Sequence, residues 1–120
     1  QRSCPYACTF CNSPEKNVLY DDQNAGDFFR KRSMKNVHTE LKELIEKYRI
    51  EYIFFVTDTF LAMSESEFDE FCEMYSEFKF PFWCQSRTET IADSVGGYEK
   101  LKMLKNVGIH VNLNDFGGFQ

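Results

Sequence analysis

From residue 37 onward the sequence alternates between helical apolar stripes and short, nearly continuous apolar runs, and this alternation constrains the fold most. Apolar residues three and four apart predict amphipathic helices that contain Val37, Phe68 and Tyr98. The other apolar runs are 51–56 (EYIFFV), 80–84 (FPFWC) and 109–113 (IHVNL), which predict strands. Such alternation is typical of βαβ units, so we expect an α/β fold with a parallel sheet.

Local signals predict where several of these elements begin and end. Asn36 is a candidate N-cap for the first helix. Ser64, followed three residues later by Glu67, has the pattern of a capping box. Gly108 is expected to stop the third helix. Because the run 51–56 is nearly continuous in apolar residues, we expect its strand to be buried on both faces.

Residues 1–35 show neither pattern and are rich in Asn, Asp, Pro and Gly, so they are predicted to form a long loop. Unstructured loops longer than about 12–15 residues are uncommon in compact domains unless they are functional. This loop contains Cys4, Cys8 and Cys11, three of the five cysteines. A metal bound to them would explain why the loop is ordered.

The three cysteines are spaced C-x3-C-x2-C, without a fourth cysteine close by. Structural zinc sites normally have four ligands, and disulfide frameworks use cysteines in pairs. Three thiolates can hold three corners of a [4Fe–4S] cluster and leave the fourth iron open for an exogenous chelating ligand. The alternative is a zinc site completed by His38 or by a distant cysteine.

Length, charge and cysteine count narrow the class of protein. The 120 residues suffice for one domain, and a net charge of −5 argues against nucleic-acid binding as the primary role. There is no secretory signal and no apolar run near the roughly 18 residues of a membrane span. An odd number of cysteines fits a reducing compartment, so we expect a cytoplasmic protein. The chain starts at Gln1, close to the first cysteine, and we expect it to be a piece of a longer protein.

The segment RSCPYACTFCNSP resembles the cluster-binding loop of the radical S-adenosylmethionine (SAM) superfamily, including an aromatic residue, Phe10, before the third cysteine. FRKRSMKNVHTELKEL, IEYIFFVTDTF, FWCQSRTETI and LKMLKNVGI follow in an order similar to the subgroup in which a cobalamin-binding domain often precedes the barrel. The resemblance covers nearly the whole chain. It implies a partial radical SAM core domain, a TIM-like (β/α) barrel truncated at both ends, with a cluster loop in 1–35 and a βα arc in 36–120.

The resemblance also implies an activity. A [4Fe–4S] cluster held by Cys4, Cys8 and Cys11 would bind SAM at its open iron and cleave it reductively to a 5′-deoxyadenosyl radical. A flavodoxin- or ferredoxin-like electron donor and a small-molecule substrate would be the partners, while the substrate and any cobalamin in the full-length protein stay open. We expect the fragment alone to be inactive. The alternative function is an iron–sulfur electron carrier, or a zinc-binding module, without SAM chemistry.

Three further residues take SAM-binding roles by the same resemblance. The backbone of Phe10 would face the adenine, and Asp58, in the TDT segment after a strand, would meet the amino group. Arg87 would pair with the carboxylate, since a guanidinium suits a bidentate contact. Two simpler interpretations stay open: Asp58 caps a turn, and Arg87 forms an ion pair with Glu89.

The sequence departs from the family pattern in three places. By the resemblance, the first barrel strand is expected to be absent apart from a stub at residues 1–3. Ser3 stands where the family usually has a glycine. At the end of the fourth strand Phe116 falls near an acidic position and Asp115 lies one place off, so we assign no site there. The remaining cysteines, Cys72 and Cys84, are expected to be core residues.

Overall fold

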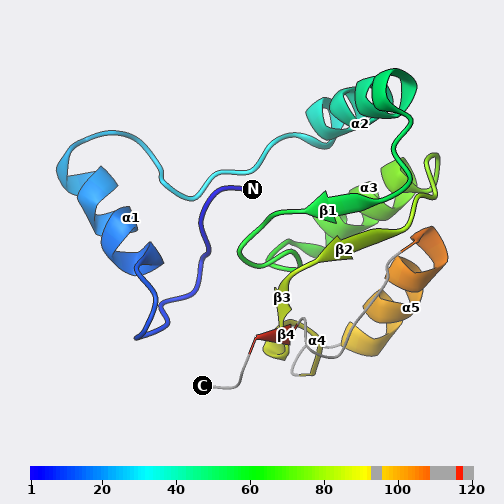
Figure 1. The fold of residues 1–120 in the computed structure, drawn as a ribbon. Helices are drawn as coiled ribbons and strands as arrows, with labels where there is room; N and C mark the ends of the chain where they lie inside the picture. Colours follow the sequence, from blue (N-terminus) through cyan, green and yellow to red (C-terminus); the bar gives the residue numbers. More distant parts are fainter. Residues whose placement is uncertain (93–95, 109–115, 118–120) are drawn as a thin grey trace.

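The computed structural model describes residues 1–92, 96–108 and 116–117 (Figure 1). The helices are α1 (Ser13–Asp22), α2 (Met34–Tyr48), α3 (Glu65–Tyr75), α4 (Glu89–Ala92) and α5 (Gly97–Val107), and the strands are β1 (Ile53–Phe55), β2 (Phe82–Cys84), β3 (Ser86–Arg87) and β4 (Phe116–Gly117). Between residues 34 and 108 the predicted alternation of helices and strands is present, with β3 and α4 as two short elements that the sequence did not predict. The predicted strand at 109–113 lies outside the described residues.

The strands pair in parallel, as predicted, but in two separate pairs. β1 lies beside β2 with Phe54 opposite Trp83, and β3 lies beside β4 with Arg87 opposite Gly117. Between β2 and β3 the carbonyl of Gln85 accepts a hydrogen bond from the backbone N–H of Phe60 at 2.7 Å. Within the described ranges each strand thus has a single partner, and the expected arc is not one continuous sheet.

An aromatic core lies between the β1–β2 pair and the helices on one of its faces (Figure 1). Phe55, Phe71, Tyr75 and Phe82 have ring centroids between 4.9 and 5.8 Å apart, mostly edge to face. Such ring pairs add to the hydrophobic stabilisation from burial itself. The buried hydroxyl of Tyr75 donates to the Phe80 carbonyl at 3.0 Å, which satisfies the one polar atom of this cluster.

The opposite face of the β1–β2 pair is open, so the prediction that the first strand is buried on both faces is wrong. Phe54 is 55% exposed and stacks on Trp83 with a centroid distance of 4.0 Å. Alternate residues of a strand point to opposite faces, and only one face of this pair meets the described helices. An apolar run shows that both faces are apolar, not that both are covered.

Side-chain caps define the starts of α2 and α3. Ser33 is the N-cap of α2, because its hydroxyl accepts the N–H of Asn36 at 3.3 Å. The prediction of Asn36 as the cap is therefore wrong by three residues. The capping box of α3 is confirmed: the N–H of Ser64 donates to the Glu67 carboxylate at 2.7 Å, and the Ser64 hydroxyl accepts the N–H of Glu67 at 3.3 Å.

Helix α1 corrects the prediction that residues 1–35 form a single loop. Pro14 and Glu15 lie in its first turn, where proline and acidic side chains are favourable. Of its ten residues only Ser13 is buried, so α1 has no apolar stripe that periodicity could reveal. Figure 1 shows this helix apart from the sheet, on the far side of the N-terminal loop.

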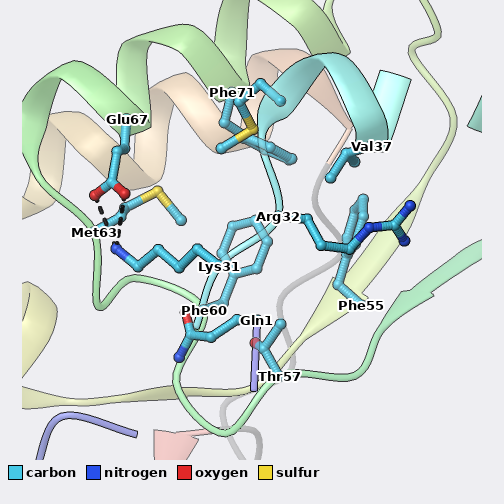
Figure 2. A pocket seen from close by; sticks show the side chains of 11 residues that line it. Gln1, Lys31, Arg32, Val37, Phe55, Thr57, Phe60, Met63, Glu67 and Phe71 are labelled. Atoms are coloured by element: carbon cyan, nitrogen blue, oxygen red, sulfur yellow. Dashed lines mark hydrogen bonds and ion pairs between the residues drawn. The ribbon is translucent and has the colours of Figure 1, made fainter. Parts of the chain in front are cut away.

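A small cavity of about 100 Å³ opens beside the helix-facing side of β1 (Figure 2). Its lining is Gln1, Lys31, Arg32, Met34, Val37, Phe55, Thr57, Phe60, Met63, Glu67 and Phe71. Lys31 and Glu67 form an ion pair at 2.8 Å beside it, drawn as dashes in Figure 2. The cavity is mainly apolar and its lining contains none of the loop cysteines, so it is separate from the thiol site described next.

None of the helices in the described ranges is both long enough and apolar enough to cross a membrane.

Candidate metal centre

The cysteine loop is anchored at the carboxyl end of β1. Cys4 is buried, and its Sγ lies 3.2 Å from the hydroxyl of Thr59, a buried residue just beyond that strand. Cys8 and Cys11 are half-buried, and the Cys11 N–H donates to the Cys8 carbonyl at 3.0 Å, which closes a turn between them. All three thiols are free. The loop therefore presents its cysteines where parallel α/β proteins carry their chemistry.

Cys11 lies at the start of α1, and this position favours its thiolate. The backbone N–H of Ser13 donates to Cys11 Sγ at 3.4 Å and lowers the pKa of the thiol. The carboxylate of Asp58 acts in the opposite direction and raises the same pKa. Because the thiolate is the form that binds metals, the helix start prepares Cys11 as a ligand.

Arg87 reaches the same loop from β3. Its Nη1 donates to Cys8 Sγ, and its Nη2 pairs with the Glu89 carboxylate at 2.5 Å. The guanidinium carbon lies 4.5 Å from the ring centroid of Tyr6. The ion pair with Glu89, one of the two interpretations of Arg87, is thus present, and the contact with Cys8 accompanies it.

The other two predicted site residues are solvent-exposed. Asp58 follows β1 and is exposed, next to Thr59, whose hydroxyl contacts Cys4. Phe10 is 80% exposed, in the turn just before Cys11. The structure thus brings Asp58 and Arg87 to the loop, whereas their roles toward a cofactor stay predictions.

Tyr6 and Thr59 are contacts that sequence reasoning missed. Thr59 lies within the TDT segment, beside the predicted Asp58, and Tyr6 lies between two of the cysteines. The sequence predicts Glu89 as a surface partner of Arg87, but the side chain of Glu89 is 26% exposed and that of Arg87 is 19% exposed. The place of Tyr6 and Thr59 in the site depends on contacts between distant segments, which spacing does not reveal.

The donor set fits an iron–sulfur cluster in its chemistry. Three free thiols lie on one loop, with hydrogen-bond donors directed at two of the sulfurs, those of Cys8 and Cys11. In the described part of the chain no three His, Cys, Asp or Glu side chains are gathered closely enough to hold a single metal ion. Of the residues that could complete a zinc site, His38 pairs with Glu77 at 2.8 Å, and Cys72 and Cys84 are buried.

A loop with three free cysteines at the carboxyl end of β1, beside an arginine from β3, defines an α/β protein with a metal- or cofactor-binding loop. A family model described as the Radical SAM superfamily matches residues 1–116. The chain therefore belongs to the radical SAM superfamily, whose members are enzymes that use an iron–sulfur cluster and SAM. Comparison with curated proteins gives no match, and comparison with solved structures gives none either.

Ser3, which stands where the family usually has a glycine, has the left-handed backbone conformation with φ 65°. A non-glycine residue there costs about 1–2 kcal/mol, and the buried Ser3 hydroxyl has no hydrogen-bond partner among the described atoms. We therefore expect Ser3→Gly to raise the free energy of unfolding by about 1 kcal/mol, after the entropy cost of glycine is subtracted. Urea unfolding measures this change.

The matched control for Ser3→Gly is Asn24→Gly. Asn24 also has a positive φ, 50°, but it is exposed and asparagine tolerates this conformation. Its substitution should change the free energy of unfolding by less than that of Ser3. A Ser3→Gly protein less stable than the wild type would show that Ser3 is not strained.

Proposed function

We propose that this chain forms the cluster- and SAM-binding part of a radical SAM enzyme, with Cys4, Cys8 and Cys11 as the ligands of a [4Fe–4S] cluster. The observation that carries the proposal is the convergence of two strand ends on the cysteine loop: Thr59 contacts Cys4 and Arg87 contacts Cys8. When bound, such a cluster supplies the electron that cleaves the sulfonium C–S bond of SAM, giving methionine and a 5′-deoxyadenosyl radical.

The residues of the loop hold and prepare the ligands. The hydroxyl of Thr59 orients the buried sulfur of Cys4, and the N–H of Ser13 favours the thiolate of Cys11. Three cysteines occupy three irons and leave the fourth without a protein ligand, which is the open position that a catalytic metal site keeps. The amino and carboxylate groups of SAM are suited to chelate that iron.

Arg87, Asp58 and Phe10 are the proposed SAM contacts on this chain. The Nε of Arg87 is buried and has no hydrogen-bond partner among the described atoms, so the guanidinium keeps a donor for the SAM carboxylate. The exposed carboxylate of Asp58, next to the Thr59 that contacts Cys4, suits the amino group. The backbone at Phe10, beside the third cysteine, would face the adenine.

We also propose that the parallel strands belong to a larger TIM-like barrel. The open face of the β1–β2 pair supports this, because the exposed Phe54–Trp83 stack needs a covering layer. A reduced flavodoxin- or ferredoxin-like protein would supply the electron. The substrate and any use of cobalamin lie outside this proposal.

Binding of SAM tests the proposal at a single residue. Arg87→Ala, in the protein at its natural length with the cluster reconstituted anaerobically, should weaken SAM binding by about 1.5–3 kcal/mol, the range for a hydrogen bond to a charged group. That is roughly a 10- to 150-fold loss of affinity. Equilibrium binding followed by the change in the electron paramagnetic resonance (EPR) spectrum of the cluster measures it.

The control is Lys102→Ala, which removes an exposed cation paired with Glu99 on α5. This variant should bind SAM as the wild type does, and both variants should keep their iron. Wild-type affinity in Arg87→Ala would remove Arg87 from the SAM site.

A further inference from the structure

The guanidinium of Arg87 is held on three sides, which fixes it against one cysteine. Glu89 pairs with Nη2 at 2.5 Å, the ring of Tyr6 lies 4.5 Å from the guanidinium carbon, and Nη1 donates to the sulfur of Cys8. The backbone is fixed as well, because Arg87 is in β3 and pairs with Gly117 of β4. A half-buried cation with three partners keeps its position better than an exposed one, whose long side chain is free to turn.

We propose that Arg87 donates a hydrogen bond to the Cys8 sulfur while Cys8 is an iron ligand, and that it thereby raises the reduction potential of the cluster. This inference rests on the proposed function, since it needs the cluster on this loop. It goes beyond the proposed SAM contact, because the contact with Cys8 acts on the cluster whether or not SAM is bound. A thiolate sulfur bound to iron keeps lone pairs that can accept an N–H.

The direction of the shift in reduction potential follows from the positive charge of Arg87. Reduction adds an electron to the cluster, and a positive charge with an N–H directed at a ligating sulfur stabilises the reduced form more than the oxidised form. Hydrogen bonds to the sulfurs and local charge are among the factors that set the potentials of iron–sulfur clusters, and outer-shell partners tune metal sites in general. Removing Arg87 should therefore move the midpoint potential to a more negative value.

Tyr6 is the positioning residue for this contact. It lies within the cysteine loop, between Cys4 and Cys8, so its ring moves with the ligands and keeps the guanidinium over them. A cation is attracted to the face of an aromatic ring, and tyrosine and phenylalanine share this property. Tyr6→Phe should therefore keep the wild-type potential, whereas Tyr6→Ala should shift it in the same direction as loss of Arg87.

The test is a redox titration of the reconstituted, SAM-free protein at its natural length, followed by the EPR signal of the reduced cluster. Arg87→Met should give a more negative midpoint potential than the wild type. Arg87→Lys keeps the positive charge but loses the forked pair of N–H donors, so it should give a smaller shift in the same direction. Lys102→Met, which removes an exposed cation on α5, controls for net charge and should titrate as the wild type does.

An unchanged potential in Arg87→Met overturns the inference. If Arg87→Met fails to hold a cluster, the potentials of Arg87→Lys and Tyr6→Ala provide the test instead. Wild-type potentials in both of these variants would also overturn the inference. The outcomes that refute the proposed function differ from those that refute this inference. A wild-type protein that assembles no cluster on this loop refutes both, whereas unchanged potentials in variants of a protein that still cleaves SAM refute only the role of Arg87 toward Cys8.

Discussion

Replacement of Cys8 by alanine is expected to abolish the iron–sulfur cluster. Each cysteine of the loop supplies one iron with its only protein ligand, so the loss of a single thiolate leaves two ligands for four irons. After anaerobic reconstitution the wild-type protein should contain about four iron and four sulfide, and Cys8→Ala should contain neither. Cys4→Ala and Cys11→Ala should give the same result. Iron and sulfide analysis, together with the visible absorption spectrum, measures it.

The two cysteines outside the loop provide the matched controls. Cys72 lies in the core on α3, where burial raises the pKa of its thiol to about 11, and Cys84 is buried in β2. The thiolate of Cys72 is therefore scarce near neutral pH, and the structure gives both residues a packing role. Cys72→Ala and Cys84→Ala should keep the full cluster. A cluster that survives in Cys8→Ala would overturn the ligand assignment.

Gly108→Ala is expected to lower the free energy of unfolding by about 3 kcal/mol, a loss typical of backbone strain combined with overpacking. Gly108 ends α5 with φ 124°, and a Cβ there would lie 2.4 Å from the carbonyl oxygen of Phe80. The Gly108 carbonyl accepts the N–H of Phe82, so the chain cannot move away without loss of a bond beside β2. Urea or thermal unfolding measures the loss.

Gly26→Ala separates the two causes of that loss. Gly26 also has a positive φ, 76°, but a Cβ there would meet nothing within 4 Å. Its substitution should cost about 1–2 kcal/mol, the strain of the left-handed conformation alone. Equal losses at the two glycines would show that the contact with Phe80 contributes nothing.

The helices and strands that the sequence predicts well are those that bury one apolar side. The stripe that contains Phe68, Phe71 and Tyr75 forms the buried side of α3, since helical periodicity and burial have the same cause. The capping box at Ser64 is equally local, because all of its atoms lie within one turn of the helix. The runs 51–56 and 80–84 form strands for the same reason, although the observed strands are shorter.

The predictions that failed depend on what surrounds an element. α1 buries almost none of its side chains, so no apolar periodicity indicates this helix. Its start is signalled only by Pro14 and Glu15. The apolar run at 51–56 could not show that Phe54 stays exposed, because coverage of a face depends on other segments. Of the fourth strand, the run 109–113 and Asp115 lie outside the described residues, while Phe116 begins β4.

The candidate site also has a part that the sequence could predict and a part that it could not. Cys4, Cys8 and Cys11 could be recognised because their spacing is contained within eight residues. The placement of Arg87 at Cys8 joins residues 79 apart in the chain, and only the resemblance to the family suggested that they meet. The positions of Thr59 and Tyr6 in the site required the fold itself.

The central claim, that this loop carries a cluster that cleaves SAM, is tested most directly by adding SAM to the reduced, reconstituted protein at its natural length. The products are then separated by chromatography. We predict 5′-deoxyadenosine together with methionine from the wild-type protein, and neither from Cys8→Ala. If the wild-type cluster stays intact and reduced but no 5′-deoxyadenosine forms, the protein is an iron–sulfur electron carrier and the proposed activity is wrong.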